Sequence, residues 1–159
     1  MKDFYFRIED FKYEKWLIFY EEFGGKRIFK TKDIDCFYIA PSESSDKMFD
    51  VYIKTWFGHS ALRWETESKE EIKSAFKKLC KEMIKVEPQF KEYNHHCINF
   101  KNIEEIKSIT DTDKPRIRLY FGIGGVEFGN TTEQEINNIK KDFKQYCSDN
   151  QIKLNETNL

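Results

Sequence analysis

A chain of 159 residues with 39% hydrophobic and 16% aromatic side chains can fold around a core, which argues against an intrinsically disordered protein. Its 27 basic and 28 acidic residues leave a formal net charge of −1, which argues against both a strongly basic nucleic-acid binder and an acidic mimic of DNA. No apolar run approaches the roughly 20 residues that span a bilayer, and the first residues lack the apolar core of a signal peptide, so we expect no membrane partner and a cytoplasmic location.

The N-terminal segment, residues 1–48, is predicted to be rich in β-structure. Residues 15–20 form a dense apolar segment, and Gly24-Gly25 separates this segment from the next one. Glycine adopts positive φ at little cost, so the diglycine predicts a hairpin. A further strand is expected at residues 35–39, before Pro41 and a polar loop.

Residues 49–87 are predicted to form a β–β–α unit. Val51, Ile53 and Phe57 fall on one face of a strand, because side chains two residues apart share a face. A turn and a returning strand follow. Ser68 is then placed to cap a helix, because a carboxylate lies three residues later and apolar residues follow at helical spacing.

Residues 98–148 are predicted to repeat this order, ahead of a polar tail at 149–159. Strands are expected at 103–109, 116–121 and 126–128, with Thr132 as the second helix cap. A gap-free shift of 64 positions aligns the two units, for example Phe57 with Phe121. The fold class predicted is therefore α+β, with antiparallel sheets, two tandem β–β–α repeats and an N-terminal β-hairpin in one compact pseudo-symmetric domain.

Catalytic and metal signatures are weak. His95, His96 and Cys97 could supply metal ligands, but adjacent residues on a strand point to opposite faces. The glycine-rich segment at 122–125 joins two strands and lacks the ending of a phosphate loop. The four cysteines have no close spacing and are interpreted as reduced thiols. We expect no enzyme activity, no cofactor and no metal.

The outward faces of the two predicted hairpins carry aromatic and basic groups. If the apolar positions face the helices, alternation sends a second set of side chains the other way. These candidate partner-binding residues are Tyr52, Lys54, Trp56 and Arg63 in the first unit and Arg116, Arg118, Tyr120 and Glu127 in the second. Three interpretations stay open: packing against the rest of the chain, binding of a protein, or stacking of single-stranded nucleic acid.

The paired hairpin–helix segments, residues 50–84 and 114–147 after a short β-rich start, resemble the phage-type anti-CRISPR proteins that inhibit type II-A Cas9 nucleases. This resemblance implies a non-enzymatic inhibitor that binds its nuclease in a fixed stoichiometry. Some members imitate DNA with an acidic surface, and the near-zero charge of this chain favours binding to a protein domain of Cas9 instead. The alternative function is a single-stranded nucleic-acid-binding module that uses an aromatic–basic sheet face.

Overall fold

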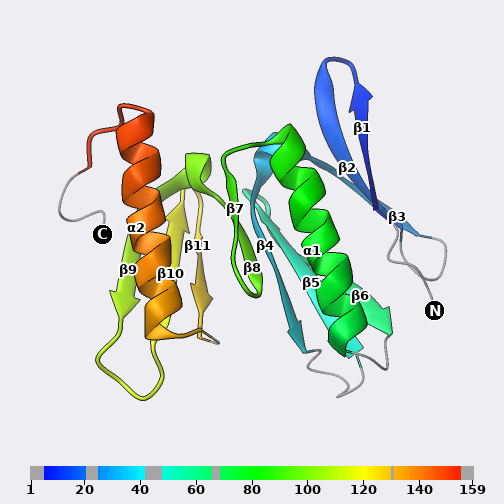
Figure 1. The fold of residues 1–159 in the computed structure, drawn as a ribbon. Helices are drawn as coiled ribbons and strands as arrows, with labels where there is room; N and C mark the ends of the chain where they lie inside the picture. Colours follow the sequence, from blue (N-terminus) through cyan, green and yellow to red (C-terminus); the bar gives the residue numbers. More distant parts are fainter. Residues whose placement is uncertain (1–5, 21–24, 42–47, 66–68, 130, 155–159) are drawn as a thin grey trace. The chain divides into compact units, whose positions relative to one another are not determined.

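The structure is a computed structural model that describes residues 6–20, 25–41, 48–65, 69–129 and 131–154, with backbone alone at 41, 48–50, 61–65 and 69. Figure 1 shows how its elements follow one another along the chain. They are β1 (Phe6–Phe11), β2 (Glu14–Tyr20), β3 (Lys26–Lys30), the 3-10 turn η1 (Thr31–Asp33), β4 (Ile34–Pro41), β5 (Met48–Thr55), β6 (Gly58–Glu65), α1 (Lys69–Val86), β7 (Phe90–Glu92), β8 (His96–Asn99), the 3-10 turn η2 (Phe100–Asn102), β9 (Ile103–Ile109), β10 (Arg116–Phe121), β11 (Gly125–Phe128) and α2 (Glu133–Asp149).

The predicted α+β class is confirmed. Every strand pairing in the described residues is antiparallel, and the strands form three sheets in the orders β1-β2-β3, β6-β5-β4-β8-β7 and β11-β10-β9. An N-terminal hairpin is present as β1–β2. In the described part of the chain, no helix combines the length and the apolar character needed to cross a bilayer.

The chain divides into two compact units, Met1–Asn99 and Phe100–Leu159. In the first unit, α1 packs its apolar stripe on the five-stranded sheet, and the ring of Phe76 meets the ring of Phe37 edge-on at 5.7 Å. Leu17 and Phe19 of β2 are buried in the same core, so the N-terminal sheet is part of this unit. Burial of these rings and branched side chains is the main source of stability.

The second unit is a three-stranded meander with α2 over one face (Figure 1). The helix begins after Thr132, whose hydroxyl accepts a hydrogen bond from the amide of Glu135 at 3.2 Å, as the cap prediction required. Phe143 of α2 meets the ring of Phe100 at 5.8 Å. The side chains buried in this unit are Phe100, Ile103, Ile106, Ile117, Leu119, Phe121, Val126, Phe128, Ile136, Ile139, Phe143 and Cys147.

Both units contain a 3-10 turn, three antiparallel strands in order and an α-helix, but the predicted repeat is not confirmed. Its gap-free register fails at the hairpins. In the first unit Thr55 pairs with Gly58 across the residues 56 and 57, whereas in the second Tyr120 pairs with Gly125 across 121–124. The predicted boundaries at 49–87 and 98–148, and their union in one pseudo-symmetric domain, stay predictions.

Phe57 is placed differently from its prediction. It was expected to face the helix as the counterpart of Phe121, but Phe57 lies in the β5–β6 turn with 81% of its surface exposed, whereas Phe121 is 3% exposed. The reason is that the alternating pattern in the sequence continues two residues past the end of β5, to Phe57, whereas the chain already turns at residues 56 and 57. The Ser68 cap prediction lies outside the described residues.

The turn between β1 and β2 had no sequence signal. Lys12 and Tyr13 form it with φ of 51° and 65°, and Phe11 pairs with Glu14 on either side. Two successive positive φ angles are the geometry that suits hairpin twist, although asparagine and glycine usually supply it. The Gly24-Gly25 hairpin was expected between β2 and β3, which do pair, but residues 21–24 lie outside the described part of the chain.

Candidate binding surface

Strand β10 separates its side chains cleanly between the two faces of its sheet. Ile117, Leu119 and Phe121 are buried on the side of α2. Arg116 and Arg118, together with the partly exposed Tyr120, therefore point away from the helix, because successive side chains of a strand alternate between faces. For β10, the alternation predicted from sequence holds.

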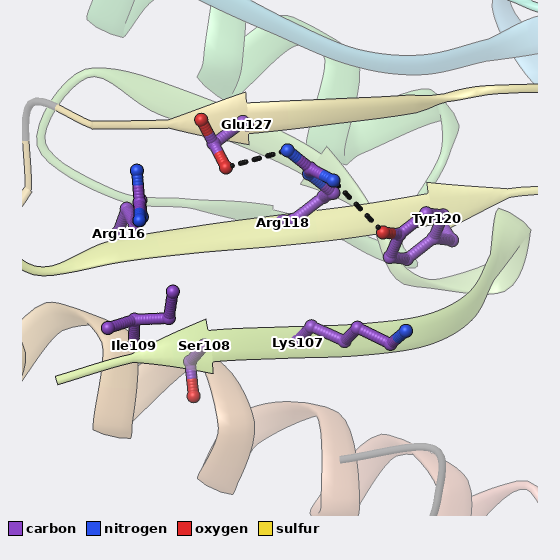
Figure 2. Close-up of a pocket in the computed structure, with 7 residues that line it drawn as sticks. All are labelled: Lys107, Ser108, Ile109, Arg116, Arg118, Tyr120 and Glu127. Atoms are coloured by element: carbon purple, nitrogen blue, oxygen red, sulfur yellow. Dashed lines mark hydrogen bonds and ion pairs between the residues drawn. The ribbon is translucent and has the colours of Figure 1, made fainter.

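Side chains of the neighbouring strands β9 and β11 lie beside these three residues on the same face of the sheet. Arg118 lies opposite Lys107 of β9 and Glu127 of β11. Tyr120 lies opposite Glu105 and Gly125, and Arg116 lies opposite Ile109. We call this set the β10 face; its members are Glu105, Lys107, Ile109, Arg116, Arg118, Tyr120 and Glu127, and Figure 2 draws all of them except Glu105.

Arg118 is the centre of the polar contacts on the β10 face. Its Nη2 donates to Glu127 Oε1 at 3.0 Å, and its Nη1 donates to the Tyr120 hydroxyl at 3.3 Å, as Figure 2 shows. The hydrogen bond with Tyr120, followed by the charge of Glu127, raises the pKa of Arg118 above its already high ordinary value. Arg118 therefore stays charged, and the two contacts fix the position of its guanidinium between Glu127 and Tyr120.

Tyr120 of β10 lies between Lys107 of β9 and Gly125 of β11. The Lys107 ammonium lies 5.5 Å from the centre of the Tyr120 ring and 3.7 Å from Glu105 Oε1. At Gly125, an added Cβ would lie 2.9 Å from the Leu119 carbonyl oxygen and 3.3 Å from the Tyr120 ring. Glycine is therefore needed here for the backbone to pass so close to the β10 strand.

Arg116 is the open cation of the β10 face. Among the residues that the structure describes, no hydrogen bond or ion pair engages its guanidinium. Ile109, opposite it, is 44% exposed. Arg116 and Ile109 line a depression of about 450 Å³ together with Ser108 and four residues of the β10 face, Lys107, Arg118, Tyr120 and Glu127. An unengaged guanidinium next to exposed apolar surface is a combination that partner proteins contact.

No protein-family model matches the chain, and no curated protein matches it.

Among the described residues of the first unit, Lys54 departs from the predicted outward face. Lys54 was expected to point outward and to be available to a partner, and this is wrong: its side chain is 2% exposed, and its Nζ lies 2.8 Å from Asp35 Oδ2. The register between β4 and β5 shifts between Ile34 and Cys36, which leaves Asp35 as the extra residue of a bulge. Bulges re-aim side chains, and here the carboxylate reaches Lys54.

Tyr52 lies in an aromatic cluster. Its ring stacks on Tyr38 with centres 5.0 Å apart and planes at 11°. The Tyr38 hydroxyl lies 3.5 Å from His59 Nδ1. Burial, followed by the nearby Cys36 and Tyr52, raises the pKa of Tyr38 to about 12. Tyr52 thus stacks on a neighbouring strand and is partly exposed, and its role as a partner-binding residue stays a prediction.

Trp56 lies in the β5–β6 turn instead of on the strand. It is 49% exposed, and its ring lies against the Phe57 ring with centres 3.5 Å apart. The side chain of Arg63 is outside the described part of the structure. The structure therefore brings together four of the eight predicted residues, all in the second unit: Arg116, Arg118, Tyr120 and Glu127.

Sequence reasoning missed the contribution of β9 to this surface. Glu105, Lys107 and Ile109 occupy alternate positions of a strand that was predicted, so the same alternation would have placed them together on one face. What the alternation could not supply is the register that sets Lys107 beside Arg118. Within the described residues, no group of three or more His, Cys, Asp or Glu side chains is placed to hold a metal ion.

Proposed function

We propose that the chain is a non-enzymatic binding protein that acts through the β10 face and that its partner is a protein. The observation that carries this proposal is the open guanidinium of Arg116 beside exposed Ile109, next to an Arg118–Tyr120 pair that is already held in place. Arginine and tyrosine are enriched among the residues that dominate binding energy at protein interfaces. A preorganised pair also loses little conformational freedom on binding.

The charge pattern of the face supports a protein over a nucleic acid. Glu127 pairs with Arg118 and Glu105 lies near Lys107, so two of the three cations already have acidic neighbours. A surface that binds a phosphate backbone gains most from cations that are free to replace counterions. A face of mixed, paired charges suits a protein surface of complementary pattern instead.

The partner that we propose is a CRISPR–Cas9 nuclease, inhibited through one of its protein domains. The support is the resemblance of the two hairpin–helix segments to anti-CRISPR proteins, together with a net charge of −1 that disfavours imitation of DNA. Cas9 cleavage depends on docking of its HNH domain after DNA binding. A protein that holds a domain away from its docked position would block cleavage without competing for the target.

A pull-down against guide-loaded Cas9 orthologues tests this proposal. The full chain is expected to retain at least one orthologue, and Arg116→Ala with Tyr120→Ala is expected to weaken that binding by about 30-fold or more, the scale of a hot-spot loss. Lys141→Ala, an exposed lysine of α2, is the matched control and is expected to bind as the parent does. Failure of every orthologue to bind would overturn the choice of Cas9 as the partner. Equal binding by the Arg116→Ala, Tyr120→Ala protein and the Lys141→Ala control would overturn the assignment of the β10 face as the binding surface.

A further inference from the structure

The N-terminal sheet carries a second aromatic and basic surface. On its inner side, Leu17 and Phe19 of β2 are buried in the core, with Phe6, Ile8 and Phe29 packed against it. The alternate positions therefore face the other way. We call this opposite side the β2 face; its members are Arg7, Glu9, Trp16, Ile18, Tyr20, Lys26, Ile28 and Lys30.

Two aromatic–lysine pairs cross from β2 to β3 on this face. Trp16 lies opposite Lys30, and Tyr20 lies opposite Lys26. The Lys30 ammonium is 5.4 Å from the centre of the Trp16 ring. The two pairs are four residues apart along the strands, which corresponds to about 13 Å. The β2 face therefore repeats one aromatic ring and one cation at a regular interval along an extended strand.

Strand β1 fixes the rings from the other side. The Trp16 Nε1 donates a hydrogen bond to the Phe11 carbonyl oxygen at 3.2 Å, which sets the orientation of the indole. The Arg7 guanidinium lies 5.8 Å from the centre of the Tyr20 ring and is paired with Glu9 at 2.6 Å. Ile28, between the two lysines on β3, is 48% exposed. The rings are thus oriented beside open apolar surface.

The lysines of the β2 face differ in their partners from Lys107 and Arg118 of the β10 face, which lie beside carboxylates. Among the residues that the structure describes, neither Lys26 nor Lys30 has a carboxylate within ion-pair distance. The nearby Glu14 is instead engaged by Lys32 at 2.6 Å. Unpaired lysines can neutralise phosphates and release their counterions, and this release is the main source of nucleic-acid affinity.

We infer that the β2 face binds single-stranded nucleic acid, with one base stacked at Trp16, another at Tyr20, and phosphates beside Lys30 and Lys26. An extended single strand can offer bases and phosphates to both pairs, whereas a duplex keeps its bases stacked inside. This site goes beyond the proposed protein-binding function, lies in the other unit and uses none of the residues of the β10 face.

Fluorescence anisotropy with labelled oligo-dT and oligo-rU of about 12 nucleotides tests the inference on the full chain. Both probes are expected to bind at about 50 mM salt, and two phosphate contacts predict an affinity about sevenfold weaker at about 200 mM. Lys26→Gln with Lys30→Gln is expected to weaken binding at low salt and to remove most of this salt dependence. Lys77→Gln with Lys81→Gln on α1 makes the same change in net charge and is expected to leave binding unchanged.

Substitutions at Tyr20 separate stacking from folding. Tyr20→Phe keeps the ring and is expected to bind as the parent does, whereas Tyr20→Leu removes it and is expected to weaken binding by about fivefold or more. Absence of binding to both probes at low salt would overturn the inference. Equal losses of affinity from the Lys26, Lys30 substitutions and from the Lys77, Lys81 substitutions would also overturn it. The same holds for a duplex of equal length that binds as tightly as the single strand.

Discussion

Lys54 and Asp35 form a buried ion pair that replaces the exposed cation expected from the sequence. Both side chains are nearly excluded from solvent, at 2% and 8% exposure, and the Lys54 ammonium also donates to the carbonyl oxygen of Thr55 at 3.3 Å. A pair in such a site has lost the hydration of two charges, so each partner depends on the other. This mutual dependence has a measurable signature.

Asp35→Ala is expected to lower the free energy of unfolding by about 3–5 kcal/mol, because it leaves the Lys54 charge buried without its carboxylate. The double substitution Asp35→Leu with Lys54→Met removes both charges together and is expected to cost much less, or nothing. Urea denaturation of the three proteins measures both effects. If the single and double variants lose the same free energy of unfolding, the dependence of Lys54 on Asp35 is contradicted.

Tyr38 makes the stability of the first unit depend on alkaline pH. Its pKa is about 12 in the folded chain against an ordinary value of 10, because burial disfavours the phenolate. Above pH 10 the unfolded chain loses this proton while the folded chain keeps it, so the contribution of Tyr38 to stability is full below pH 10 and falls as pH rises toward 12.

The Tyr38→Phe variant is therefore expected to lose less of its unfolding free energy than the parent between pH 10 and about 12. Absorbance titration of the tyrosines should also show that the variant lacks one late-titrating group. A parent and a variant with the same dependence on pH in this range would show that Tyr38 titrates normally.

At the scale of elements, the β1–β2 hairpin is closed by residues that are poorly suited to its turn. Lys12 and Tyr13 both hold positive φ, which costs a non-glycine residue roughly 1–2 kcal/mol. Tyr13 is fully exposed and Phe11 is 60% exposed, so burial of these side chains offsets little of the cost. The pairing of β1 with β2 keeps the turn in place.

Lys12→Asn with Tyr13→Gly is expected to raise the free energy of unfolding by about 1 kcal/mol, because Asn-Gly favours this turn type. Tyr13→Ala keeps the strained backbone and is the matched control, with no gain expected. Thermal and urea unfolding measure both proteins. No stabilisation by the Asn-Gly pair would mean that the turn carries no strain.

The elements that sequence patterns predicted well are those with local causes. Thr132 caps α2 through a contact three residues along the chain. The side chains of β10 alternate between buried and exposed because successive residues of a strand point to opposite faces. The bulge at Asp35 depends on how β4 meets β5, and the end of β5 depends on a two-residue turn without a glycine between its strands. Patterns within one segment do not contain that information, so Lys54 and Phe57 were misplaced.

At the scale of the whole molecule, the two units share an order of elements, but their described residues differ on the predicted outward faces. The prediction of matched outward faces assumed that both hairpins face solvent alike. In the first unit, Lys54 is buried against Asp35 and Tyr52 stacks on Tyr38, and an aromatic–basic surface is present on the N-terminal sheet around Trp16. In the second unit, Arg116 and Arg118 keep the predicted orientation. Partner binding through one unit is the central claim that follows.

Titration of target-DNA cleavage by a guide-loaded Cas9 tests that claim most directly. Close to physiological ionic strength, with the nuclease well above the Kd of the complex, the parent chain is expected to reduce cleavage linearly until it equals the nuclease in concentration. In a second titration, with the nuclease below the Kd of the parent complex, the Arg116→Ala, Tyr120→Ala protein is expected to need about 30-fold more for the same effect, the scale of a hot-spot loss. Cleavage that the parent chain leaves unchanged, or that both proteins inhibit equally, would contradict the account.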